Sequence, residues 1–126
     1  MLFHVTAEHD HETCPGREEG MGGDAVRIAQ KWLEGNDEVK VLGAWGHQPS
    51  HKGFAIVESS DFSAVSQLLR GMMLIGTCEV LPVNDNIAAR KNRGHWESNE
   101  TTRTVLTLSS LRANTLYEVN NPTYYN

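Results

Sequence analysis

The sequence predicts an α+β fold, because extended apolar runs and amphipathic helical patterns alternate along the first two-thirds of the chain. Apolar residues recur with period two in strands and with period 3.6 in helices. These periods place strands at about 2–7, 38–46, 53–58 and 74–83, and helices at about 23–34 and 61–71. The resulting β-α-β-β-α-β order is typical of the split-βαβ, or ferredoxin-like, arrangement, an antiparallel sheet with helices on one face.

The first strand shows which of its residues should meet the helices. Successive side chains of a strand point to opposite faces, so its apolar set is expected to be buried. That set is Phe3, Val5 and Ala7. The alternate residues His4 and Thr6 should then lie on the face that the helices leave uncovered.

The helix ends are predicted from capping residues. Asp24 is the expected N-cap of the first helix, and Ser60 or Asp61 that of the second, since a short polar side chain can accept from free backbone N–H groups. Gly35 is expected to end the first helix, because glycine readily adopts the backbone conformation found after a helix.

The chain is expected to divide near Asn84, where the apolar periodicity stops. Residues 1–85 should form the α+β domain, and residues 86–126 an extension or arm that packs on the same or a neighbouring subunit. The short basic cluster 90–93 is expected in a solvated loop. This extension has too few apolar residues for a core of its own.

Composition narrows the classes of partner. The chain has 126 residues and a formal net charge of -5, with no Lys/Arg stripe, so nucleic acid is not an expected partner. The longest uncharged apolar run, residues 72–78, is too short to span a bilayer, and the N-terminus does not resemble a signal peptide. Two cysteines do not suggest a disulfide framework, so a cytoplasmic protein with reduced thiols is expected.

The first candidate site is a metal site in the turn-rich segment after the first strand. Imidazoles, a thiol and neighbouring carboxylates are ligand types used for Zn, Ni, Cu or Fe. The expected ligands are His9, His11 and Cys14, joined by His47 or His51 from the following hairpin. The alternative is a solvated polar loop in which histidines happen to cluster.

The second candidate site is the uncovered sheet face, where His4, Trp45 and Glu58 could converge. His4 would act as a general base, since the pKa of a free imidazole is about 6.5 and is easily tuned. Trp45 would line a cavity, and Glu58 or Glu79 would orient the imidazole. The alternative is that these side chains bridge two subunits.

The runs Leu2–Val5, Val41–Trp45 and Gly53–Glu58, taken with the element order, resemble the dimeric α+β-barrel superfamily. The likeness is nearest to its short uncharacterised bacterial families and more distant to muconolactone isomerases and antibiotic-biosynthesis monooxygenases. It covers about residues 1–85. It implies a homodimer whose sheets pack face to face, with a ligand inside the barrel or between sheet and helices, and it carries over no catalytic residue.

Three functions are therefore compatible with the sequence. The leading hypothesis is a homo-oligomeric protein, dimeric or larger, that binds a transition metal or small ligand through its His-rich N-terminal segment. The second is a cofactor-independent isomerase, cyclase or monooxygenase acting on a small organic substrate. The third is a structural assembly subunit. Fold likeness alone does not select among them.

Overall fold

The computed structural model of the protein describes residues 1–98 and confirms an α+β fold with an antiparallel sheet. The chain divides into two compact units, Met1–Val83 and Asn84–Asn126. The first unit contains the sheet and the helices that cover it. The second contains α4 (Asn86–Asn92). The rest of the expected arm, residues 99–126, lies outside the described part of the chain.

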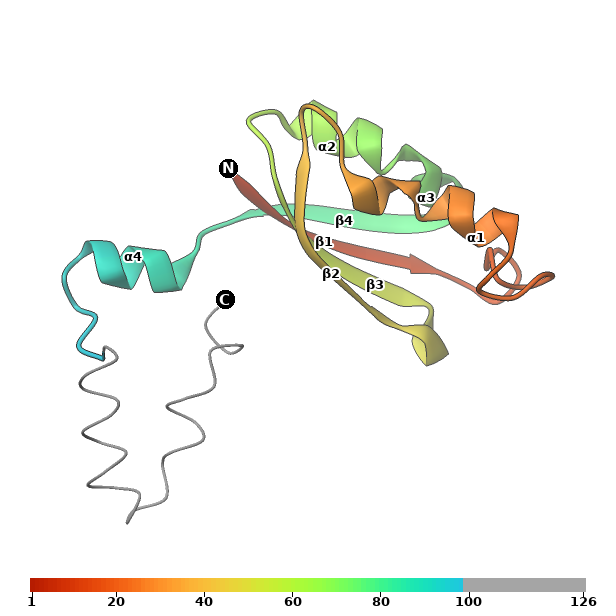
Figure 1. The fold of residues 1–126 in the computed structure, drawn as a ribbon, viewed down its shortest axis with the longest axis horizontal. Coiled ribbons are helices and arrows are strands. Elements are labelled where there is room, and N and C mark those ends of the chain that lie inside the picture. The colour runs from red at the N-terminus through yellow and green to blue at the C-terminus, as the bar shows by residue number, and fades with distance from the viewer. Residues whose placement is uncertain (99–126) are drawn as a thin grey trace, which may run out of the picture. The chain divides into compact units, whose positions relative to one another are not determined.

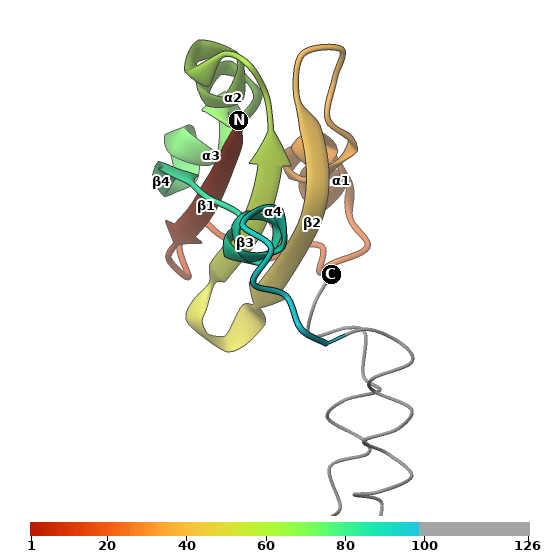
Figure 2. The ribbon, with the colours of Figure 1, turned by 90° about the vertical axis from the view of Figure 1, so that its left-hand side faces the viewer.

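The first unit is built on a four-stranded sheet in which every pairing is antiparallel. Its strands are β1 (Leu2–His9), β2 (Lys40–His47), β3 (Lys52–Glu58) and β4 (Gly76–Val83). They lie in the order β2-β3-β1-β4, as Figure 2 shows. The first strand is therefore central and pairs with both β3 and β4.

Short helices cover one face of this sheet (Figure 1). They are α1 (Asp24–Ala29), the 3-10 helix η1 (Lys31–Glu34), α2 (Phe62–Leu68) and α3 (Arg70–Ile75). A further 3-10 turn, η2 (Gln48–Ser50), joins β2 to β3. The helix face of β1 is buried as predicted, with Phe3, Val5 and Ala7 each at most 3% exposed.

The core lies between this face and the helices. Its largest fully buried side chains come from two strands, from α2, from the residue before β2 and from the junction of α2 and α3: Val5, Val57, Val65, Val39 and Leu69. Phe3 packs against Phe62 of α2 with ring centroids 6.0 Å apart. Burial of such side chains is the main stabilising contribution to a domain of this size.

A β-bulge at Leu42 changes which face the rest of β2 presents. Val41 pairs with Val57, but the next pair is Gly43 with Ile56, so Leu42 has no partner in the ladder. An extra residue shifts the alternation of a strand by one. Beyond the bulge, Ala44 therefore lies on the helix-covered face with its neighbour Ala55.

The sequence overestimated the length of the first helix and underestimated the extent of the second helical segment. The segment predicted as one helix over 23–34 is a six-residue α-helix followed by a 3-10 turn. The segment predicted over 61–71 is two short helices that continue to residue 75, so β4 begins two residues later than expected. Gly35 ends the first segment as expected. It has a φ of 69°, and a Cβ there would come within 2.6 Å of the Val39 carbonyl oxygen.

Two local predictions were also wrong. Asp24 is the first residue of α1 and not its N-cap, which is Gly23, and the Asp24 carboxylate instead pairs with Arg27 at 3.1 Å. The basic segment expected in a loop lies largely in α4, whose N-cap Asp85 accepts from the Ala88 N–H. Of the two N-caps expected for the second helix, it is Asp61 that caps α2, accepting from the Ser63 N–H at 2.9 Å.

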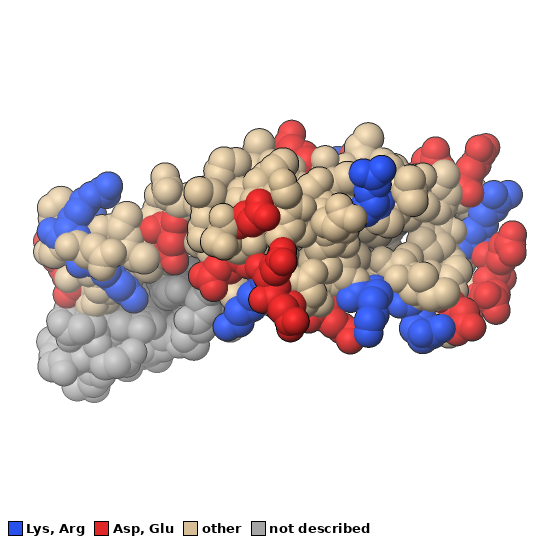
Figure 3. Space-filling model, turned by 90° about the horizontal axis from the view of Figure 1, so that it is seen from above, with Lys and Arg blue, Asp and Glu red and all other residues tan. Residues whose placement is uncertain are grey.

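The surface of the described residues carries charges of both signs. In the view from above in Figure 3, Lys and Arg side chains alternate with Asp and Glu, and uncharged residues lie between them. No helix within residues 1–98 is long and apolar enough to cross a membrane.

Candidate metal centre and adjoining pocket

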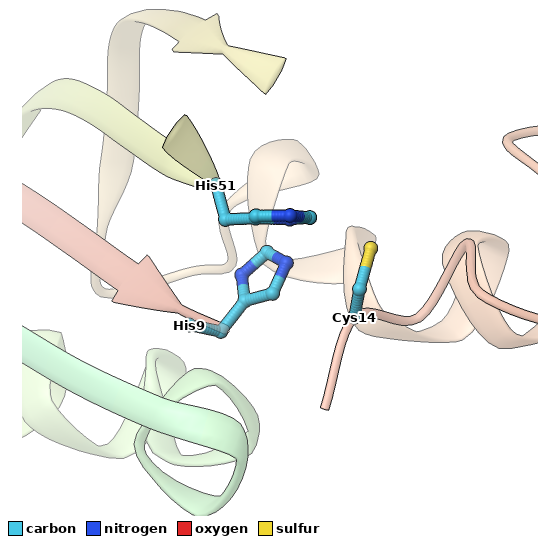
Figure 4. A group of neighbouring side chains, drawn as sticks. All are labelled: His9, Cys14 and His51. Carbon is cyan, nitrogen blue, oxygen red and sulfur yellow. The ribbon is translucent and has the colours of Figure 1, made fainter. Parts of the chain in front are cut away.

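Three side chains from separate segments converge at one end of β1. His9 is the last residue of β1, Cys14 lies in the loop that follows, and His51 lies in the β2–β3 connection. One ligand atom from each lies within 4.8 Å of the others. Figure 4 shows the imidazoles and the thiol directed toward a common space. The rings of His9 and His51 meet edge to face, 5.0 Å between centroids.

A hydrogen-bonded turn at Asp10 sets the position of Cys14. The Asp10 carboxylate accepts from the backbone N–H groups of Glu12 and Thr13, each at 2.9 Å, and from the Thr13 hydroxyl at 3.1 Å. These bonds hold the pKa of the Asp10 carboxyl below its ordinary value, the backbone bond from Thr13 contributing most. Aspartate commonly stabilises such turns because its side chain substitutes for a backbone acceptor.

The hairpin connection brings His51 to the same place. After η2, His51 adopts a left-handed backbone with φ of 55°, the only non-glycine residue within the described range with positive φ. Its carbonyl oxygen accepts from the His9 N–H at 3.2 Å. Histidine is among the residues that tolerate this conformation, although it is uncommon. The strained residue is therefore also one of the three converging donors.

The environment of His9 favours the neutral form of its imidazole. Burial lowers the pKa of His9, the nearby His51 lowers it further, and Asp10 acts in the opposite direction. Its Nε2 atom is buried and has no hydrogen-bond partner among the described residues. A neutral imidazole nitrogen without a partner is an available ligand atom, and burying it unpaired is costly.

The other predicted metal ligands lie outside this cluster. His11 is exposed and its ring is 6.2 Å from that of His51, on the edge of the group. His47 lies at the end of β2, where its Nδ1 is 2.7 Å from the Ser50 hydroxyl oxygen. The structure thus brings His51, and not His47, to His9 and Cys14.

A pocket of about 530 Å³ adjoins the three donors, which form part of its lining. Its sheet side is made by small residues, namely Ala7, Ala44, Gly46 and Gly53. Its other side includes Val26 of α1 and Trp32 of η1. The pocket exists because the sheet contributes little side-chain volume where the short helix α1 passes.

The residues predicted to be catalytic are distributed differently. His4 is partly buried and lies in the middle of β1 between Ile56 and Leu81, on the face without helices. Glu58 is exposed at the end of β3. Within residues 1–98, neither of these two residues lines the pocket, whereas Trp45 does. The assignment of His4 as a general base stays a prediction.

Comparison with known proteins gives a family without an assigned activity. A profile described as a domain of unknown function, DUF3303, matches residues 1–103. The chain belongs to the DUF3303 family. The match spans all four strands, the three converging donors and α4. No significant match was found among curated proteins or among solved structures.

Sequence reasoning did not identify the pocket of this DUF3303 chain. The small residues Ala44, Gly46 and Gly53 could have indicated a hollow in the sheet. The bulge that turns Ala44 and Gly46 toward the helices, however, cannot be deduced from the period-two alternation of the sequence.

The second cysteine, Cys78, differs from Cys14 in its surroundings. Burial raises the pKa of the Cys78 thiol, which favours its protonated form, and Cys78 is partly buried and packs against the core.

Proposed function

We propose that this DUF3303 protein binds a transition-metal ion through His9, Cys14 and His51, and that Zn²⁺ fits the donor set best. The observation that carries the proposal is the convergence of three ligand atoms, within 4.8 Å of one another, from three segments of the chain. Two imidazoles and one thiolate are common ligands for Zn²⁺, and three protein ligands leave one position open. Cu and other soft or borderline ions are the alternatives.

The geometry requires only a small adjustment. Zn–N and Zn–S bonds of about 2.0–2.3 Å place tetrahedral ligand atoms roughly 3.3–3.7 Å apart. The donors would therefore approach one another by about 1 Å, which side-chain rotation can supply. The buried, unpartnered Nε2 of His9 supports the proposal, because metal coordination would satisfy it.

Metal titration of protein purified without a His-tag tests this function. We expect one equivalent of Zn²⁺ per chain, and a Co²⁺-loaded form whose thiolate charge-transfer band is lost in Cys14→Ser. Loss of a ligand should cost more than the 10–100-fold in affinity typical of a supporting residue, so His51→Ala should weaken binding by at least about 100-fold.

His47→Ala is the matched control, since it removes an imidazole from the same hairpin outside the cluster. It should leave Zn²⁺ affinity unchanged, and His11→Ala should have a smaller effect than His51→Ala. Uptake below about a tenth of an equivalent, or equal losses in His47→Ala and His51→Ala, would contradict the site.

We also propose that the chain forms a homodimer of the ferredoxin-like, dimeric α+β-barrel type. The strand order β2-β3-β1-β4 and the helices on a single face support this assignment. So do large exposed apolar side chains on the opposite face, where Trp45 is 64% exposed and Leu81 is 48% exposed. Large exposed apolar side chains on one face are typical of interaction surfaces.

Sedimentation equilibrium tests the assembly. The wild-type protein should sediment as a dimer, and Leu81→Glu should shift it toward monomer, because an unpaired carboxylate would be buried in the interface. The exposed Leu74→Glu on α3 is the control and should leave the dimer intact. A monomeric wild-type protein would contradict the proposal.

A further inference from the structure

The pocket beside the three donors has an uneven distribution of polar groups. Its walls are largely apolar, with Val26, Trp32 and Leu33 opposite the small residues of the sheet. The imidazoles of His9 and His51 and the Cys14 thiol lie together in its lining. A volume of about 530 Å³ is within the usual range of small-molecule sites, roughly 300–1,000 Å³.

The charge of the lining favours an anion. Within the described part of the chain, Asp and Glu do not contribute to the lining, and the one lysine in it, Lys52, pairs with Glu8 on the face of the sheet without helices. A divalent ion bound by two neutral imidazoles and one thiolate would add a net charge of about +1. Opposite charges attract strongly in a site that is partly screened from water.

We propose that the pocket binds a small organic acid with an apolar body, whose carboxylate occupies the open position of the metal at His9, Cys14 and His51. This inference rests on the proposed metal site. A carboxylate oxygen is an ordinary zinc ligand, and the apolar walls would bury an aromatic ring or a short branched chain.

Calorimetric titration with 3-phenylpropionate tests the ligand class. We expect zinc-loaded protein to bind it at least about tenfold more tightly than metal-free protein, each tenfold step being about 1.4 kcal/mol. Two probes separate the parts of the ligand. 3-Phenylpropan-1-ol keeps the body without the charge, and acetate keeps the charge without the body, so both should bind at least about tenfold more weakly.

A pocket-filling variant tests the location. Ala44 lines the pocket and is exposed on the helix-covered side of β2, so Ala44→Leu should fill space without disturbing the core. It should lower 3-phenylpropionate affinity at least about tenfold and leave Zn²⁺ affinity within about twofold. Ala25→Leu is the matched control, because Ala25 is exposed on α1 and is not part of the lining.

The outcomes separate the two proposals. A protein that takes up no Zn²⁺ contradicts the metal site and this inference together. A protein that binds Zn²⁺ normally but binds the acid and the alcohol equally, or binds the acid equally with and without zinc, contradicts the inference alone. Unchanged acid affinity in Ala44→Leu would likewise overturn the assignment of the pocket.

Discussion

The helix-covered face of the sheet has a filled part and a hollow part, and side-chain volume distinguishes them. In the filled part, Phe3 pairs with Val57, and both are at most 2% exposed. In the hollow part, Ala7 pairs with Gly53 and Gly46 lies beyond it, and all three line the pocket. The same sheet thus forms a packed core along one stretch and a binding-site candidate along the next. Where small side chains replace large ones on the strands and only a short helix covers them, a cavity opens between sheet and helix.

The strongest test of this comparison is truncation of one leucine from each part. Leu69 is fully buried in the core, and Leu33 lines the pocket and is 38% exposed. Leu69→Ala should lower the free energy of unfolding by about 2–5 kcal/mol, through lost burial and the cavity left behind. Leu33→Ala should cost less than about 1 kcal/mol, because much of its surface already faces open space. Urea denaturation of the metal-free protein measures both.

Equal losses for the two leucines would contradict the comparison, because they would mean that the pocket is packed in solution. A change in the slope of the denaturation curve would have to be examined first, since it reports on the denatured state as well as on stability.

Substitution of Gly76 tests how closely β1 and β4 approach each other beside His9, at the end of β1 that adjoins the pocket. Gly76 begins β4 opposite His9, and a Cβ at Gly76 would overlap the backbone carbonyl oxygen of Glu8. Gly76→Ala should therefore cost about 1–3 kcal/mol, the usual penalty for overpacking. Gly71→Ala in α3 is the control, because a Cβ there meets no atom within 4 Å among the described residues. It should be neutral or stabilising by up to about 1 kcal/mol.

The Gly76→Ala variant also sharpens the proposal for the metal site. If β4 moves away from Glu8, His9 should move with the end of β1 and Zn²⁺ affinity should fall. A Gly76→Ala protein as stable as the wild type would show that the strands can separate there at little cost.

The smallest expected effect concerns the first turns of the helices above each part. The Asp61 side chain caps α2, whose Ala64 and Val65 belong to the core, so Asp61→Ala should cost about 1 kcal/mol. Asp24 begins α1 above the pocket and makes only an exposed ion pair with Arg27, so Asp24→Ala should change stability by less than about 0.5 kcal/mol. Thermal unfolding followed by circular dichroism can rank the two variants, and the reverse ranking would contradict the capping assignment.

The sequence predicted the strands better than the helices. Period-two alternation correctly placed Phe3, Val5 and Ala7 on the buried face, because strand burial follows directly from the pattern. The first helix was predicted too long because apolar spacing continues through Lys31–Glu34, where the chain changes to a 3-10 turn. That change involves only a small difference in backbone angles, which apolar spacing does not record.

The candidate metal centre was only partly predictable. His9 and Cys14 are close in sequence, and the type of chemistry followed from their side chains. The choice between His47 and His51 depends on the left-handed backbone at His51 and on the pairing of β1 with β3. Neither the backbone conformation nor the strand pairing can be deduced from the spacing of apolar residues. The hairpin histidine of the cluster could therefore be predicted only as His47 or His51.

The bulge at Leu42 has a consequence for how tolerant this hairpin is to changes of length. If the bulge closed with every residue retained, Leu42 would pair with Ile56 and each later side chain of β2 would move to the opposite face. Trp45 would then face the cavity, and Ala44 would lie on the face where the indole had been. Deleting Leu42 removes the extra residue and leaves the later pairings as they are, so a chain shortened at this position should keep both ligand capacity and self-association.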